Sequence, residues 1–153
     1  MEAELVNTSF KTIYTIGHSN RAIEEFLEIL KAHGVTLLVD VRRFPSSRRA
    51  PWFNRSILEE FLKTIGVEYV WLGESLGGYR PGGYREYMKT KSYVEGVEKL
   101  IELINGCRGS IAIMCSEKLW FKCHRRFISS TLCLKGIKVL HIIDKGVLYE
   151  HKC

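Results

Sequence analysis

The stretch Thr36-Leu37-Leu38-Val39-Asp40-Val41 decides the fold class of this 153-residue chain. Its apolar residues follow one another with little polar interruption, which is typical of an inner strand of a parallel sheet that is covered on both faces. Similar short runs occur at residues 12–16, 68–72, 110–115 and 138–143, and amphipathic segments separate them. This alternation predicts a three-layer α/β/α fold with a mainly parallel central sheet of about five strands.

Amphipathic helices are expected between these strands. Residues 23–30 carry apolar side chains at helical spacing, and a second helix should run from about Arg55 to Ile65 and bury Ile57. A glycine follows each of these segments, as is common at the end of a helix. After the last predicted strand, residues 144–146 predict a hairpin turn that leads back through residues 147–149.

Two more helices are predicted in the second half of the chain. Ser92 and Glu95 match a capping box, which predicts the start of a long helix in which Val94 is buried. Another helix is expected from about Cys123 to Leu134. Between the elements, the connections Arg42–Asn54 and Gly73–Gly83 are longer than usual for such folds, and long loops in compact domains often carry function.

The composition is that of a soluble globular domain, with 46% hydrophobic and 26% charged residues. We therefore expect residues 1–153 to form a single domain. No apolar run approaches the roughly twenty residues of a membrane span, and Glu2 and Glu4 stand where a signal peptide carries bases. The sequence thus predicts a cytoplasmic protein without a membrane partner.

The five cysteines are an odd number in a chain without a recognisable secretion signal, which favours reduced thiols over a disulfide framework. Cys107, Cys133 and Cys153 are expected to be packing residues. His33 and His151 have no supporting neighbours in the sequence and are expected at the surface, whereas His141 is expected inside a strand.

Reactive side chains follow four of the predicted strands. Because parallel strands end at a common edge, where open α/β sheets bind their ligands, we expect these side chains to meet there. They are His18 and Ser19 after the first strand, Asp40 and Arg42 after the second, Glu74 after the third, and Cys115 and Glu117 after the fourth. Asp40 has a structural alternative, a buried ion pair with Arg42.

The helix after the fourth strand starts with a thiol, an imidazole and two guanidiniums. A helix N-terminus and neighbouring cations stabilise a thiolate, so the pKa of Cys123 should be low. The candidate catalytic residues are Cys123, Cys115, His18, His124, Asp40 and Glu117. The candidate anion-binding residues are Arg42, Ser19, Ser46, Arg125 and Arg126.

An excess of 23 basic over 17 acidic side chains gives the chain a net charge of +6 and favours anionic partners, either small molecules or nucleic acid. Much of this positive charge lies between Arg42 and Arg55, where five arginines occur without an acid. Guanidiniums bind phosphates and aromatic rings stack on bases. The candidate nucleic-acid-binding residues are therefore Arg43, Arg48, Arg49, Trp52 and Arg55.

No cofactor motif is recognisable in the sequence. The glycine-rich segment 77–85 lacks the Lys-Ser/Thr ending of a phosphate-binding loop. A metal site from Cys115, Cys123 and His124 is not expected, because adjacent ligands crowd one centre and the spacing of structural zinc sites is missing.

Several segments together resemble the family catalogued as domain of unknown function 488 (DUF488), over about residues 12–151. The segments are Thr15–Ser19, Leu38–Arg42 with Pro45 and Ser46, Gly77-Gly78, Cys115 with Glu117, Cys123–Arg125, and His141-Ile142 through Gly146 to His151. The resemblance implies a site made of His18, Asp40, Arg42, Cys115, Glu117, Cys123, His124 and Arg125, and it names no reaction.

Three functions are compatible with these residues. The favoured one is an enzyme that acts on a phosphate-bearing or nucleic-acid substrate, because a binding module has no need of two cysteines, an aspartate and two histidines at strand ends. One alternative is a non-catalytic nucleic-acid-binding module that uses the Arg42–Arg55 loop. The other is a thiol redox protein that uses Cys115 and Cys123.

Overall fold

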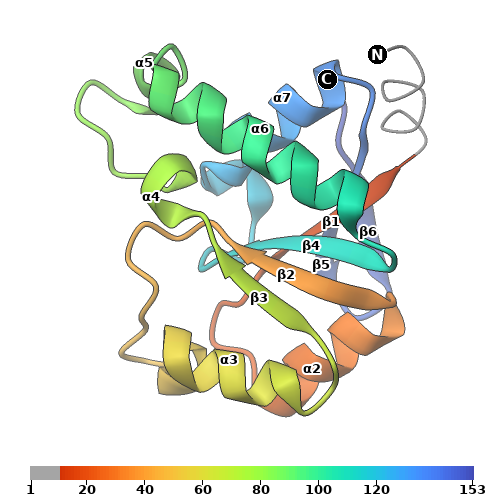
Figure 1. The fold of residues 1–153 in the computed structure, drawn as a ribbon. Coiled ribbons are helices and arrows are strands. Elements are labelled where there is room, and N and C mark those ends of the chain that lie inside the picture. The colour runs from red at the N-terminus through yellow and green to blue at the C-terminus, as the bar shows by residue number, and fades with distance from the viewer. Residues whose placement is uncertain (1–10) are drawn as a thin grey trace.

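The computed structural model describes residues 11–153, and its elements form three layers around one sheet (Figure 1). The sheet has the strand order β3-β2-β4-β1-β5-β6; all neighbours are parallel except the last pair. The expected α/β fold class, with its mainly parallel sheet and C-terminal hairpin, is confirmed. The strands are β1 (Thr12–Gly17), β2 (Val35–Asp40), β3 (Glu68–Trp71), β4 (Ser110–Cys115), β5 (Lys138–Asp144) and β6 (Val147–Glu150).

Helices cover both faces of the sheet. One face packs against α2 (Ile23–Ala32), the short 3-10 helix η1 (Pro51–Phe53) and α3 (Arg55–Lys63). The other face packs against α6 (Lys91–Gly106) and α7 (Arg125–Leu134), which lie above the sheet in Figure 1. The shorter elements near that face are α4 (Gly73–Leu76), α5 (Tyr84–Tyr87) and the 3-10 helix η2 (Trp120–Lys122).

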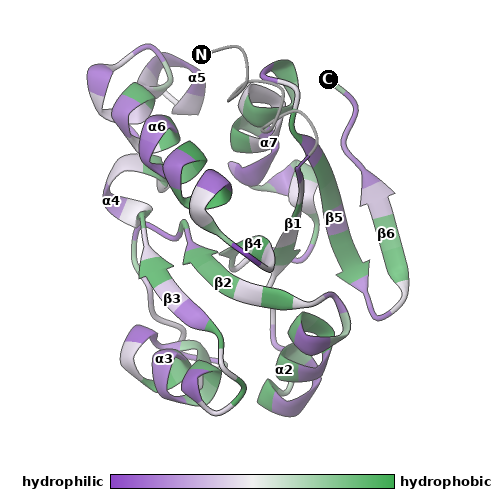
Figure 2. Cartoon of the chain, turned by 45° about the vertical axis from the view of Figure 1, so that its right-hand side comes forward, coloured by the Kyte–Doolittle hydropathy of each residue, from purple (hydrophilic) through white to green (hydrophobic). Residues whose placement is uncertain are grey.

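The inner strand β2 explains why its sequence is apolar throughout. Leu37 and Val39 belong to the hydrophobic core under α6 and α7, whereas Leu38 belongs to the core above α2 and α3. Successive strand residues point to opposite faces, so a strand between two helical layers must be apolar at every position. The helices need only one apolar side, and Figure 2 shows hydrophilic and hydrophobic residues alternating along them.

The predicted cap of the long helix α6 is wrong by two residues. The side chain of Thr90, not that of Ser92, caps the helix by accepting a hydrogen bond from the backbone N–H of Tyr93. Tyr93 is buried, and Val94, which was predicted to be buried, is exposed. Ile57 on α3 is exposed as well. Val94 and Ile57 flank the apolar side of their helices, whose central positions Val97, Leu100, Leu58 and Leu62 are buried.

Two predicted boundaries also differ. The helix expected from Cys123 begins at Arg125, because η2 and an extended Cys123 precede it. The connection expected over Gly73–Gly83 begins with the single helical turn α4. The turn of the C-terminal hairpin contains Gly146 with a positive φ of 76°, as the predicted turn requires.

The expectations for two cysteines and one histidine are wrong. Cys133 on α7 and Cys153 form a disulfide. His151 is buried, and its backbone N–H donates to the carbonyl oxygen of Val139. The sequence pattern did not show that the segment after β6 turns back onto α7 and β5, and this return brings residues 20 positions apart into contact.

The sequence predicted neither a signal peptide nor a membrane span, and the structure bears on these two expectations only over residues 11–153. The acidic N-terminal residues that argued against a signal peptide lie outside residues 11–153. Over those residues, none of the helices has the length and apolar character that crossing a bilayer requires.

Gly17, at the end of β1, lets two segments of backbone come unusually close. A Cβ at this position would lie 1.8 Å from the carbonyl oxygen of Glu117, far inside van der Waals contact. The loop after β4 therefore rests directly on the end of β1, and hydrogen bonds from His18 and Ser19 to the carbonyls of Cys115 and Ser116 continue the contact.

We predict that Gly17→Ala lowers the free energy of unfolding by at least about 2 kcal/mol, because backbone must move to admit the methyl group. The matched control is Gly106→Ala at the end of α6, where a Cβ meets nothing within 4 Å. That control should leave stability unchanged or raise it by up to about 1 kcal/mol. Urea unfolding of both variants measures the difference, and equal effects would contradict the close approach at Gly17.

Candidate active site at the carboxyl edge of the sheet

A cavity of about 790 Å³ opens at the carboxyl edge of the parallel strands. The end of β4, the loop after β2, the glycine-rich loop with the start of α5, η2 and the start of α7 contribute its walls. This is the edge at which the sequence predicted the site. Of the candidate residues, those that line the cavity are Arg42, Arg43, Ser46, Cys115, Glu117, Cys123, His124 and Arg126.

A buried ion pair supports the cavity from below. Asp40 is fully buried and accepts hydrogen bonds from Arg42 Nε at 2.9 Å and from Arg42 Nη2 at 2.7 Å. The Tyr69 hydroxyl donates to the same carboxylate at 2.5 Å, and burial next to Asp40 raises the pKa of Tyr69, so the phenol stays protonated. Because Asp40 neutralises it, Arg42 forms a rigid wall and not a free cation.

His18 is held in one tautomer beside this ion pair. An arginine can only donate, so His18 Nε2 accepts from Arg42 Nη1 at 3.3 Å, and Nδ1–H donates to the Ser19 carbonyl at 2.7 Å. Its ring stacks on the buried ring of Phe53 with a centroid distance of 4.4 Å. Burial lowers the pKa of His18 to about 4, and the charge of Arg42 acts in the same direction. His18 is therefore neutral at pH 7.

The thiol of Cys123 faces the ring of His124. His124 Nε2 lies 2.9 Å from the carbonyl oxygen of Val41 and therefore carries a proton that it donates there. The other ring nitrogen, Nδ1, lies 3.6 Å from Cys123 Sγ. The backbone N–H of Arg125 also donates to Sγ at 3.4 Å. The N–H of Arg125 stabilises negative charge on the sulfur atom, and His124 does the same in the form in which both ring nitrogens carry a proton.

Cys115 and Cys123 titrate in opposite directions. The pKa of Cys123 is lowered by a hydrogen bond from the Cys115 thiol and by His124 and Arg125. The pKa of Cys115 is raised by complete burial and by its hydrogen bond to Cys123. Cys123 is thus the thiolate of the pair, and Cys115 is the thiol that donates to it.

Arg125 lies under the thiol pair and is almost fully buried. Its Nη1 donates to Thr15 Oγ1 at 3.0 Å and its Nη2 to the Glu117 carbonyl at 2.5 Å. Within residues 11–153 it forms no ion pair with a carboxylate, and its Nε has no hydrogen-bond partner. The thiolate of Cys123 is the anion that its charge stabilises.

Three predicted site residues lie behind the cavity wall. His18, Asp40 and Arg125 are buried and contact the lining residues instead of the cavity itself. Ser19 is half-buried, and its hydroxyl donates to Asn20 Oδ1 at 3.4 Å. Glu74 is exposed on α4. The structure therefore separates the predicted set into side chains that face a ligand and side chains that hold them.

The arginine-rich loop does not form one continuous surface. Arg43 lines the cavity, and its Nη1 donates to the Tyr79 carbonyl at 2.5 Å. Arg55 instead lies over the Trp71 ring, with Cζ 4.8 Å from the centroid. Trp52 is half-buried against the core above α2 and α3, and its Nε1 donates to the Arg21 carbonyl. Arg48, Arg49 and Arg55 are the exposed arginines of this loop.

Aromatic side chains of the cavity were missed by the sequence analysis. Phe44 and Tyr79 are exposed at its rim with ring centroids 6.1 Å apart, and Tyr84 stacks on Phe127 inside it. The sequence feature that could have indicated these aromatic residues is the glycine-rich segment 77–85. A Cβ at Gly78 would lie 3.2 Å from His124 Nδ1, so glycine at this position brings the loop against the imidazole.

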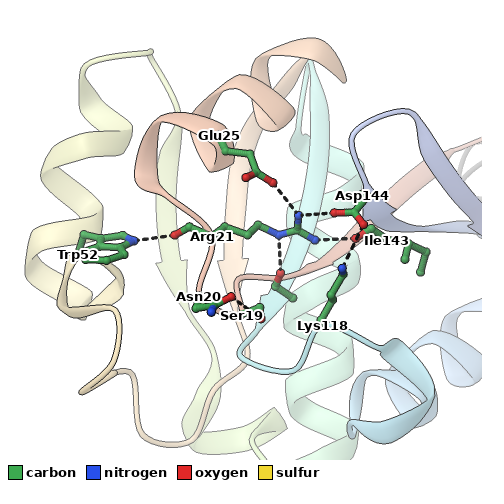
Figure 3. Close-up of polar contacts among 9 residues, drawn as sticks. Ser19, Asn20, Arg21, Glu25, Trp52, Lys118, Ile143 and Asp144 are labelled. Atoms are coloured by element: carbon green, nitrogen blue, oxygen red, sulfur yellow. Dashed lines mark hydrogen bonds and ion pairs between the residues drawn. The ribbon is translucent and has the colours of Figure 1, made fainter.

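Arg21 was also missed, and it ties three loops of this edge together (Figure 3). Its guanidinium is buried and donates to the carbonyls of Gly17 and Ile143. It also forms ion pairs with Glu25 and with Asp144, and Asp144 pairs in turn with Lys118 on the loop after β4. The ends of β1 and β5 and the loop that carries the Arg125 acceptors are thereby held in register.

Across residues 11–153 the structure contains no group of three or more histidine, cysteine or acidic side chains placed to hold a metal ion.

The fold and the site define a three-layer α/β protein with a paired thiol at the carboxyl edge of its sheet. The sequence model of the family described as Domain of unknown function DUF488 matches residues 22–132, and the chain belongs to this family. Neither the curated proteins nor the solved structures yield a significant match to the chain.

We predict that iodoacetamide alkylates Cys123 at a rate that stays nearly constant from pH 8 down to pH 6, because its lowered pKa keeps it a thiolate. A thiol in a short peptide loses most of its reactivity over this range. Cys115→Ala removes the hydrogen bond to the thiolate, so the reactivity of Cys123 at pH 6 should fall. Peptide mass spectrometry measures both rates, and a peptide-like pH profile in the wild type would contradict the assignment.

Proposed function

We propose that this protein is an enzyme that uses Cys123 as a nucleophile on a phosphate-bearing or nucleic-acid substrate. The observation that carries the proposal is the thiolate of Cys123 between His124 and Arg125 at the wall of a cavity of about 790 Å³. A lowered thiol pKa in an accessible pocket is the usual requirement of a cysteine nucleophile.

The charges around the cavity favour an anionic substrate. Arg43, Lys122 and Arg126 line it, and none of the three forms an ion pair within residues 11–153. Glu117 is the acid of the wall, and the charge of Arg42 is neutralised by Asp40. The free cations thus outnumber the acid, which suits the double negative charge of a phosphate monoester.

The aromatic rim supports a substrate that carries a base. Phe44 and Tyr79 are 63% and 83% exposed, unusual values for large rings, and both line the cavity. Arg43 Cζ lies 5.5 Å from the Phe44 ring centroid, so a cation stands beside a stacking surface. A nucleotide or the end of a nucleic-acid strand offers a base for the rings and a phosphate for the cations.

Groups that line this cavity can supply the nucleophile and carry the protons in both steps of the proposed reaction. Cys123 Sγ forms a bond to phosphorus while the bond from phosphorus to the leaving oxygen breaks, and His124 Nδ1–H protonates that oxygen. Water then attacks phosphorus and expels the thiolate, and its proton passes through Glu117 to His124. The products are the alcohol and phosphate, and the thiolate-imidazolium pair is restored.

The test is turnover of a panel of nucleoside monophosphates, aryl phosphates and short oligonucleotides. Cys123→Ser should lower kcat at least about 10³-fold, and a phosphorylated Cys123 should be trapped in the wild type by rapid acid quenching. Lys63→Gln on α3, an exposed lysine on the opposite face of the sheet, is the control for lost charge. Full turnover by Cys123→Ser would contradict the proposal. Salt-dependent binding without turnover would identify a binding module instead of an enzyme.

A second candidate function is thiol redox chemistry. The observation that favours it is that Cys115 and Cys123 both line the cavity and shift each other's pKa in opposite directions. Attack by the Cys123 thiolate on an oxidised substrate disulfide would form a mixed disulfide, which Cys115 would resolve by forming the Cys115–Cys123 bond.

Oxidation of the protein by glutathione disulfide separates this function from the first. The redox function predicts a Cys115–Cys123 disulfide in peptide maps and two equivalents of reduced glutathione. A stable glutathione adduct on Cys123 with Cys115 still free would exclude it.

A further inference from the structure

A second cavity, of about 530 Å³, lies beside α7 on the side that faces the C-terminal segment. It is lined by the cations Arg85, Arg126 and Lys152, by the apolar side chains of Met88, Trp120 and Phe127, and by the polar side chains of Ser130 and His151. No acidic side chain contributes to its wall. The proposed reaction at the thiol site does not use Arg85, Ser130, His151 or Lys152.

The cations of this cavity have no acidic partner. Arg85 and Arg126 both lie against the Phe127 ring, with Cζ atoms 5.6 and 4.5 Å from its centroid. Neither they nor Lys152 form an ion pair in the part of the chain that the structure describes. Three uncompensated positive charges around one cavity favour an anion.

A directed chain of hydrogen bonds ends in the same cavity. Arg125 Nη1 can only donate, so Thr15 Oγ1 accepts from it at 3.0 Å. Thr15 is fully buried, and His141 Nδ1, at 2.6 Å, is the acceptor available to its hydroxyl proton among residues 11–153. Leaving that proton unpaired would be costly, so Thr15 donates to Nδ1. Burial lowers the pKa of His141 to about 3, and the neutral ring carries its proton on Nε2.

The proton on His141 Nε2 fixes which group donates and which accepts in each of the remaining hydrogen bonds. His141 Nε2–H donates to His151 Nδ1 at 2.9 Å. Burial also lowers the pKa of His151, whose neutral ring therefore carries its proton on Nε2 and donates it to Ser130 Oγ at 2.8 Å. Ser130 Oγ is thus an acceptor within the protein. Within the described chain its own proton has no partner, which makes the hydroxyl a donor at the cavity wall.

The C-terminal segment is held firmly at this place. The disulfide of Cys153 to α7 follows directly after Lys152, and the His151 backbone bonds to β5 before it. Trp120 stacks on the buried ring of His141, with centroids 4.4 Å apart. The backbone of Lys152 is therefore fixed against the cavity, although its side chain is exposed.

We propose that this second cavity binds a phosphate-sized oxyanion, with the Ser130 hydroxyl as a neutral donor and Arg85, Arg126 and Lys152 as its cationic partners. A site with one oriented hydroxyl and several cations matches the oxygens of a phosphate group, which accept hydrogen bonds and carry charge. Free phosphate and the phosphate of a nucleotide strand share this chemistry.

The test is a titration of the full chain, followed by ¹H–¹⁵N NMR, with inorganic phosphate and separately with a short oligothymidylate at constant ionic strength. We expect saturable shifts at Ser130, His151 and Lys152. Lys152→Gln and Ser130→Ala should each weaken phosphate binding about tenfold, the loss of one charge-assisted hydrogen bond. Tighter binding of the oligonucleotide would identify a strand phosphate as the ligand, and binding of inorganic phosphate alone would identify the free anion.

The control is Lys31→Gln on α2, which removes the same charge from the opposite face of the sheet. It should leave the affinity unchanged, whereas Cys153→Ser should weaken binding by releasing Lys152. Absence of saturable shifts, or equal weakening by Lys31→Gln, overturns the proposal. Arg126 lines both cavities, whereas Ser130 and Lys152 line only the second one, so failure of these two variants to weaken binding leaves the proposed reaction at Cys123 untouched.

Discussion

The buried guanidinium of Arg125 is the constraint on which the site depends. A cation out of contact with water is costly unless other groups compensate its charge. Here the carbonyls of Glu117 and Lys118 and the hydroxyl of Thr15 accept its protons, and the thiolate of Cys123 supplies negative charge. The loop after β4, the start of α7 and the middle of β1 are thus held around one side chain. The same arginine that stabilises the thiolate also orders the hydrogen-bond chain toward the second cavity.

The two buried arginines of this edge have different tasks because their surroundings differ. Arg42 has a carboxylate partner, Asp40, so its charge is cancelled and it contributes rigidity and a proton donor to His18. Arg125 has only neutral acceptors and a titratable thiol, so its charge acts on the pKa of that thiol. One arginine therefore shapes the cavity, and the other adds to the effect of Cys115 and His124, which lower the pKa of Cys123.

Much of the fold could be predicted because strands between two helical layers must be apolar at every position. Ser110–Cys115 was expected as a strand and is β4 with the same bounds, and β2 is the inner strand that its sequence indicated. The cap of α6 was predicted at Ser92 and lies at Thr90, because both residue types are good caps and a local pattern does not choose between them. The disulfide of Cys133 failed because its partner arrives through the return of the C-terminal segment.

The sequence by itself determined the class of fold, the edge at which reactive residues gather, and the unusual grouping of a thiol, an imidazole and arginines near Cys123. These properties are local, since they follow from hydrophobic periodicity and from the residues that end each strand. Only the tertiary structure decided which of these side chains face the cavity, which cation is neutralised, and which of the two thiols is the thiolate. It also decided that His141 and His151 form a buried chain. Such properties depend on burial and on contacts between residues far apart in the sequence, and a local pattern does not contain them.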